Sequence, residues 1–246
     1  MVRKYIQSEF AIPCYDTDAS WRLKPVAFMN LAQEAANAHA TILGFGYDDL
    51  IASRTAWVLS RLHVEFVDTP KWRDVVSFQT WHKGLDRLFY LRDFLMTDKD
   101  GNPKVKATSS WLVLNLETRR LVRDPELMDE GTTCSENVIA APAGKVQFPK
   151  DLPEERVMEH VVAYSDVDML GHANNAMYMQ WAMDVVDYET ASTRGVKYFT
   201  INFNHEVHAG ETVVLYRACQ EMEDGLHVFV EGRTDKASSF CVEIVF

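Results

Sequence analysis

The sequence repeats itself, and this duplication limits the possible folds more than any other feature. Residues 15–18 precede an apolar segment at 28–34, and residues 165–168 precede a similar segment at 178–184. One offset of 150 residues relates Asp16 to Asp166 and Met29 to Met179. A duplicated chain is expected to form two similar units, so each structural inference for one half applies to the other.

Each half begins with a predicted helix. Apolar residues recur at helical spacing in both segments, at Phe28, Leu31, Ala32, Ala35 and Ile42 in the first and at Tyr178, Trp181, Ala182 and Val185 in the second. Pro25 suits the first turn and Gly44 the end of the first helix. Asn174 or Asn175 is the expected N-cap of the second.

Strand patterns follow each helix. The predicted strands are 62–66, 75–81, 88–96 and 105–114 in the first half, and 199–203, 212–219, 226–234 and 239–246 in the second. One long helix followed by hairpin-connected strands predicts an α+β fold in which an antiparallel sheet wraps around the helix. The segment 140–153, which contains three prolines, is predicted to be the linker between an N-terminal unit, 1–139, and a C-terminal unit, 154–246.

The charge and the apolar runs exclude several functional classes. The chain has 25 basic and 36 acidic residues, a net charge of −11, which disfavours nucleic acid and anionic lipid as partners. No apolar run approaches the ~18 residues of a membrane span, and no signal peptide is recognisable, so we expect a cytoplasmic protein. The four cysteines lack close pairing, which indicates reduced thiols.

The densest group of polar residues lies just before the second helix. Residues 165–175 include Asp168, His172, Asn174 and Asn175. A carboxylate, an imidazole and free N–H groups at a helix start could together act on a bound carbonyl group. The alternative is that the acidic residues and asparagines are turn and cap residues and that His172 is simply packed.

This segment resembles a known family. Residues 168–175, Asp-Met-Leu-Gly-His-Ala-Asn-Asn, and Tyr178 resemble the Asp-x-Asn-x-His-x-Asn-Asn element of the acyl-acyl carrier protein (ACP) thioesterases of plants and bacteria. Segments 57–61, 70–76, 109–115 and 117–121 resemble the first half of that family in the same order. The resemblance covers nearly the whole chain and implies two tandem hotdog domains, an N-terminal one that binds the acyl chain and a C-terminal catalytic one.

The resemblance also implies roles for particular residues. The catalytic Asp, His and Glu of the family match Asp168, His172 and Glu206. Asp168 is expected to be the nucleophile or the base that activates water, with the choice between it and Glu206 left open. His172 would polarise the carbonyl, and the amides near Asn174 and Asn175 would bind substrate as an oxyanion hole.

This chain departs from the family pattern at two positions. Leu170 replaces the first Asn of the motif, and Val207 replaces the Cys of the plant members, which excludes a thiol nucleophile there. In the first repeat, Arg22 replaces His172 at the offset of 150, and Thr69 replaces Glu206 at the strand offset of 137. One active site per chain is therefore expected, in the second repeat.

The expected reaction is hydrolysis of acyl-ACP to a free fatty acid in fatty acid biosynthesis. The alternatives are an acyl-CoA thioesterase, a non-catalytic module that binds acyl thioesters, and a hotdog hydratase. We expect no cofactor, because phosphate-loop glycines are absent, and no metal, because His39, His63, His82, His205 and His208 lack ligand spacing. The expected partner is ACP carrying an acyl-phosphopantetheine thioester, docked on Lys104, Lys106, Arg119, Arg120 and Arg123, and a second copy of the chain is a further candidate partner.

Overall fold

A computed structural model describes residues 4–122 and 132–246 of the chain. The first half contains β1 (Ile6–Ala11), α1 (Pro25–Ile42), α2 (Tyr47–Ala52), β2 (Thr55–Phe66), β3 (Val75–Asp86), β4 (Phe89–Thr97), β5 (Pro103–Asn115) and β6 (Leu121–Val122). The second half contains β7 (Glu155–Val161), α3 (Asn175–Asp184), α4 (Tyr188–Thr193), β8 (Tyr198–Phe203), β9 (Thr212–Met222), β10 (Gly225–Arg233) and β11 (Ser238–Val245). Short 3-10 helices at Cys14–Asp16 and Tyr164–Asp166 precede α1 and α3.

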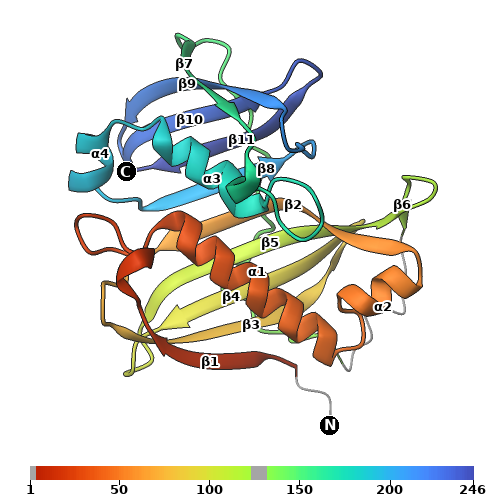
Figure 1. Cartoon of the computed structure of the whole chain (residues 1–246). Helices are drawn as coiled ribbons and strands as arrows, with labels where there is room; N and C mark the ends of the chain where they lie inside the picture. The colour runs from red at the N-terminus through yellow and green to blue at the C-terminus, as the bar shows by residue number, and fades with distance from the viewer. Residues whose placement is uncertain (1–3, 123–131) are drawn as a thin grey trace.

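The strands of both halves form one antiparallel sheet. Within the described residues its order is β1-β3-β4-β5-β2-β8-β11-β10-β9-β7, with β6 paired to β5. The second half therefore repeats the order of the first in reverse. The sequence predicted one sheet around each helix, and the structure adds that β2 and β8 pair, which joins the two sheets into one (Figure 1).

The central seam shows the symmetry of the duplication. His63 of β2 pairs with Thr200 of β8, its own equivalent at the offset of 137, and the His63 Nδ1 and Thr200 Oγ1 atoms lie 2.8 Å apart. Two antiparallel strands that pair at equivalent positions are related by a pseudo-two-fold axis through that pair. The two halves thus associate as two subunits of a symmetric dimer would, within a single chain.

Helices α1 and α3 lie on the same face of the sheet and contribute to one continuous core (Figure 1). Phe28 and Met29 of α1, and Met179 and Trp181 of α3, are at most 4% exposed. Full burial of such a side chain contributes about 1.5–3 kcal/mol to stability. The core thus holds both helices against the sheet and fixes the start of α3, where the polar residues gather.

The predicted helix ends and fold class are confirmed. Pro25 is the first residue of α1, Gly44 adopts a positive φ of 82° just beyond it, and Asn174 caps α3 by accepting a hydrogen bond from Ala176 N–H. The eight predicted strands correspond to β2–β5 and β8–β11, and the antiparallel sheet with its helices is the predicted α+β hotdog architecture. The sequence analysis did not predict β1, β6, β7, α2 or α4, which are short or lack clear periodicity.

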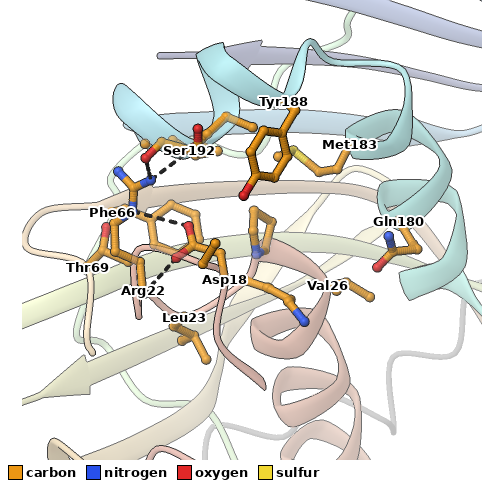
Figure 2. Close-up of a pocket in the computed structure, with 16 residues that line it drawn as sticks. Asp18, Arg22, Leu23, Val26, Phe66, Thr69, Gln180, Met183, Tyr188 and Ser192 are labelled. Carbon is orange, nitrogen blue, oxygen red and sulfur yellow. Dashed lines mark hydrogen bonds and ion pairs between the residues drawn. The ribbon is translucent and has the colours of Figure 1, made fainter. Parts of the chain in front are cut away.

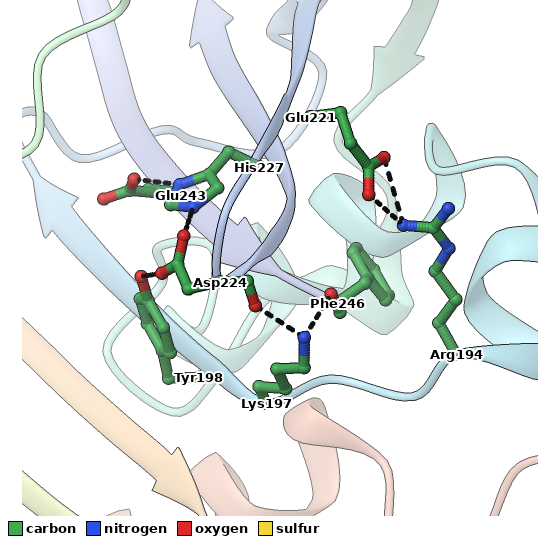
Figure 3. Close-up of polar contacts among 8 residues, drawn as sticks. All are labelled: Arg194, Lys197, Tyr198, Glu221, Asp224, His227, Glu243 and Phe246. Atoms are coloured by element: carbon green, nitrogen blue, oxygen red, sulfur yellow. Dashed lines mark hydrogen bonds and ion pairs between the residues drawn. The ribbon is translucent and has the colours of Figure 1, made fainter.

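The C-terminal end of the chain is held by a polar network on β8, β10 and β11 (Figure 3). Lys197 Nζ donates to the carbonyl oxygens of Asp224 (2.6 Å) and Phe246 (3.0 Å). His227 contacts carboxylates on both sides, Asp224 at 2.8 Å and Glu243 at 2.8 Å. Although burial opposes the charge on His227, these carboxylates raise its pKa. The network ties Lys197, just before β8, to the last residue of the chain, Phe246.

Candidate active site

A tight turn presents His172 from the loop before α3. The backbone N–H of Asp168 donates to His172 O (3.0 Å), and Gly171 N–H donates to Asp168 O (3.0 Å). Gly171 takes a positive φ of 81°, a conformation that costs a glycine little. Asp168 Oδ1 accepts a further bond from Leu170 N–H at 2.9 Å. Local backbone bonding therefore fixes the Asp168–His172 relation before any side-chain chemistry.

Glu206 approaches the turn from a second segment. Strand β8 ends at Phe203, and Glu206 lies in the loop that follows. Ala173 N–H donates to Val207 O at 2.8 Å, which ties this loop to the turn. Val207, which the resemblance to the family aligned with a Cys, is buried in the hydrophobic core.

Glu206 lies between two cationic or proton-donating groups. Its Oε2 atom is 3.5 Å from His172 Nε2 and 3.4 Å from Arg119 Nη2. All three side chains are partly exposed, at 40% for Glu206, 32% for His172 and 61% for Arg119. Arg119 comes from the first half, after β5. The sequence analysis assigned it to ACP docking and missed its contact with the site.

The carboxylate of Asp168 is not bound to the other two site residues. Within residues 4–122 and 132–246, its Oδ1 accepts from Leu170 N–H, and no hydrogen bond links the carboxylate to His172 or Glu206. Asp168 is only partly exposed. The structure thus brings the predicted Asp, His and Glu into one region and pairs two of them directly.

The two asparagines have different positions. Asn174 Oδ1 accepts from Ala176 N–H at 2.8 Å, so its side chain is an N-cap. Asn175, the first residue of α3, lines a small pocket of about 20 Å³ with Met29, Leu62, Phe94 and Trp111. Most of this pocket belongs to the first half. It places the large apolar side chains of the first half next to the start of α3.

Two buried groups support the loop. Asp166 accepts hydrogen bonds from Ala163 N–H (2.7 Å), His160 Nε2 (2.8 Å) and Trp181 Nε1 (3.3 Å). Burial opposes the charged form of Asp166, but these bonds outweigh that effect and lower its pKa. Burial raises the pKa of Tyr178, so its hydroxyl stays protonated and donates to His205 O at 3.4 Å.

His208 is a site neighbour that the sequence analysis did not predict. Its ring centroid lies 4.8 Å from that of His172, with the two ring planes inclined at 66°. His172, Glu206 and His208 each offer one atom that could bind a metal ion, and these three atoms lie within 4.8 Å of one another. The ligand-spacing argument missed this group because its members come from two separate loops. The Glu206-x-His208 spacing was the available signal.

In the first repeat, the equivalent loop before α1 carries polar side chains that bind the protein itself (Figure 2). Arg22 stands where the second repeat has His172. It contacts Asp18 through Nε at 3.2 Å and donates through Nη2 to Ala191 O (2.9 Å) and Ser192 O (2.7 Å) at the end of α4. A cavity of about 220 Å³ adjoins these residues and Thr69. It is larger than the pocket at Asn175, but its described lining contains neither His nor Glu.

The predicted basic cluster does not form one surface. Lys104 and Lys106 lie near the start of β5, whereas Arg119 and Arg120 follow its end, so about 30 Å of strand separates the two groups. Lys104 is also paired with Asp68. Arg123 lies outside the described residues. Of the predicted cluster, Arg119 contacts Glu206, and Arg120 follows it in the sequence.

Two joined hotdog units, with Asp168, His172 and Glu206 grouped before α3 and no His–Glu pair at the equivalent described positions before α1, define a double-hotdog protein with a candidate acid–base site in its second repeat. Comparison with known protein families identifies the family within this class. The profile of the acyl-ACP thioesterase N-terminal domain matches residues 3–130, and that of the C-terminal domain matches residues 150–243. The chain belongs to the acyl-ACP thioesterase family.

Individual relatives agree with this assignment. Oleoyl-acyl carrier protein thioesterase 2 of Arabidopsis thaliana, a chloroplastic protein, is 28% identical over 228 residues, which are 84% of this chain and 61% of that protein. The chain thus spans about three fifths of the length of such curated relatives. An acyl-ACP thioesterase structure from Bacteroides thetaiotaomicron is 27% identical, with a TM-score of 0.86 over 99% of this chain and 98% of that one. The 12:0-ACP thioesterase structure of Umbellularia californica shares the fold, with a TM-score of 0.84 at 20% identity.

Proposed function

We propose that this chain hydrolyses the thioester of acyl-ACP and releases a free fatty acid in fatty acid biosynthesis, as the names of its relatives suggest. One observation carries the proposal. At equivalent positions, Asp18 Oδ2 is bound to Arg22, whereas Asp168 Oδ2 has no partner among the described residues. Asp168 therefore has a carboxylate oxygen available for chemistry, next to a His–Glu pair.

Asp168, Glu206 and His172 have separate roles in the proposed reaction. Asp168 Oδ2 attacks the thioester carbon or takes a proton from the water that does so. Glu206 orients His172 through the 3.5 Å contact, and His172 hydrogen-bonds the carbonyl oxygen and supplies a proton to the departing thiolate. The carbon–sulfur bond breaks, the acid gains one oxygen from water, and the carrier leaves as a thiol.

The start of α3 supplies the group that stabilises the oxyanion. The backbone N–H groups of Ala173, Asn174 and Ala176 already donate to protein oxygens. Among the described residues at the start of α3, Asn175 has a backbone N–H and a side-chain amide that can donate to the substrate. A donor at a helix N-terminus is favoured by the helix dipole as negative charge develops on the oxygen.

The acyl chain is assigned to the first half, which gives residues 1–139 the binding role and residues 154–246 the catalytic one. The pocket at Asn175 is lined by α1, β2, β4 and β5 side chains of the first half, so an acyl chain leaving the reacting carbon meets apolar surface there. The linker at 140–153 is held in place rather than loose, since Asn202 Nδ2 donates to Val146 O at 2.9 Å.

The location and assembly of the protein remain predictions. No helix in the described part of the chain is long and apolar enough to cross a membrane. The cytoplasmic location expected from the sequence contrasts with the chloroplastic names of the curated relatives. Fractionation of the source cells tests the first, and sedimentation of the purified chain tests the predicted homodimer.

The deciding experiment is product analysis with acyl-ACP and acyl-CoA of matched chain lengths. The proposal predicts free fatty acid from acyl-ACP with higher kcat/KM than from acyl-CoA, and loss of both activities in Asp168→Asn. Equal or better rates on acyl-CoA would favour the acyl-CoA thioesterase. Binding without turnover would favour the non-catalytic module.

A further inference from the structure

The group formed by His172, Glu206 and His208, here the His–Glu–His cluster, has the composition of a transition-metal site. It offers two imidazole nitrogens and one carboxylate oxygen, all within 4.8 Å of one another. A tetrahedral ion with ligand bonds of about 2.0–2.1 Å holds its ligand atoms roughly 3.3 Å apart. The His172–Glu206 pair is already at 3.5 Å, so small side-chain rotations complete the arrangement.

The backbones that carry the cluster are held in place. The bond from Ala173 N–H to Val207 O (2.8 Å) joins the two loops between the ligands. His208 N–H donates to Glu211 Oε2 at 2.8 Å, which fixes the third ligand position from the other side. A site with a fixed backbone spends less free energy on ordering when an ion binds.

We propose that the His–Glu–His cluster binds a first-row transition-metal ion such as Zn²⁺, and that the bound ion inhibits the enzyme. Two imidazoles and one carboxylate favour Zn²⁺, Ni²⁺ or Cu²⁺ over Mg²⁺ or Ca²⁺. The ion would occupy His172 Nε2 and the Glu206 carboxylate, so neither could act on a thioester. The inhibitory part rests on the proposed function, whereas metal binding itself does not.

The first repeat provides an internal contrast. The positions equivalent to His172, Glu206 and His208 hold Arg22, Thr69 and Lys71, so they offer two cations and no carboxylate. The backbone there is matched, since Leu23 N–H donates to Pro70 O at 2.8 Å. The metal-binding set therefore depends on side chains specific to the second repeat.

Arg119 opposes the ion. Its guanidinium lies 3.4 Å from Glu206 Oε2, where it competes for the carboxylate and repels a second cation. Removing this charge is therefore expected to tighten metal binding even though it removes a contact. This expectation separates a real site at Glu206 from general binding to surface histidines.

Binding is tested by titrating the purified chain with Zn²⁺ in a calorimeter and with Co²⁺, whose visible absorption reports inner-sphere coordination. One Zn²⁺ per chain is expected. His208→Gln should weaken binding at least about tenfold, and Arg119→Gln should tighten it roughly threefold. The matched control is His205→Gln, an exposed histidine outside the cluster, with an expected change below about twofold.

Activity is measured in parallel with Zn²⁺ present. Zn²⁺ should inhibit the unmodified chain at the concentrations that saturate the calorimetric site, and His208→Gln should need a higher Zn²⁺ concentration to lose the same fraction of its own metal-free rate. Equal weakening by His205→Gln and His208→Gln, or the absence of stoichiometric binding, would overturn the proposal. If Zn²⁺ binds through His208 but the chain hydrolyses no thioester, the metal site stands and the proposed function fails.

Discussion

The loops before α1 and α3 have the same backbone and different side chains. Leu23 N–H donates to Pro70 O at 2.8 Å, and Ala173 N–H donates to Val207 O at the same distance. Two more bonds match: Asp18 N to Arg22 O (2.8 Å) with Asp168 N to His172 O (3.0 Å), and Lys24 N to Asp16 O (2.9 Å) with Asn174 N to Asp166 O (2.8 Å). Since these bonds start both central helices, both copies retain the loop for folding.

The two loops differ in what binds the second carboxylate oxygen, Oδ2, of the equivalent residues Asp18 and Asp168. In the first repeat Arg22 binds Asp18 and reaches across to α4 of the other half. In the second repeat His172 turns to Glu206 and leaves Asp168 Oδ2 free of protein partners in the described chain. One copy thus stabilises the association of the halves, and the other has groups available for catalysis.

The largest expected effect separates the two aspartates. Asp168→Asn removes the charge needed to attack or to accept a proton, so kcat should fall at least ~10²-fold with little change in thermal stability. Asp18→Asn should change kcat less than about threefold. Steady-state kinetics on one acyl-ACP, with a melting curve for each variant, measures both.

Equal damage from both substitutions in folded proteins would show that the repeats share the site. Combining Asp168→Asn with Glu206→Gln adds a further check. Because both carboxylates serve one reaction, their effects on kcat should be less than additive.

The second comparison is between Arg22 and His172, which occupy equivalent positions. We expect Arg22 to affect stability and His172 to affect activity. Arg22→Met removes the hydrogen bonds from Arg22 Nη2 to the carbonyls of Ala191 and Ser192, of which, among the described residues, only Ser192 O keeps another side-chain donor, Ser20 Oγ. The free energy of unfolding should therefore fall by about 2 kcal/mol while kcat stays within about threefold. His172→Gln should do the reverse and abolish turnover with a small stability change. Urea unfolding and kinetics on both variants test this, and a catalytic loss in folded Arg22→Met would contradict it.

The third comparison uses the aspartates that precede each helix. Hydrogen bonds lower the pKa of Asp166, whereas burial raises the pKa of Asp16 despite the nearby Lys24. Asp166 therefore stabilises the fold above its unfolded pKa of about 3.9, and this contribution is lost as pH falls through its lower folded pKa.

Asp166→Asn should accordingly cost about 2 kcal/mol at pH 7 and progressively less as pH falls below about 4. Asp16→Asn should be neutral or slightly stabilising at pH 7, since its charged form is disfavoured in the fold. Urea unfolding between pH 3 and pH 7 measures the difference, and identical pH profiles for the two variants would refute it.

The sequence predicted what depends on local pattern. The offset of 150, the helical spacing after Pro25 and the cap at Asn174 gave the helices, and alternation gave the inner strands. It did not predict the pairing of β2 with β8, because strand order depends on contacts between distant residues. It likewise missed the contacts of Arg119 with Glu206 and of His208 with His172, because these residues are distant in sequence and meet only through the fold.

The smallest effect concerns carrier docking, where the two ends of β5 can be compared. ACP is acidic, so the exposed Arg120, next to the Arg119–Glu206 contact, is expected to attract it. Arg120→Glu should raise KM for acyl-ACP about fourfold, leave short acyl-CoA nearly unchanged and weaken the salt dependence. Lys106→Glu makes the same charge change near the other end of β5 and should have little effect on either substrate. Since both variants lower the net charge equally, a similar KM increase in both would mean that ACP responds to overall charge rather than to a surface beside the site.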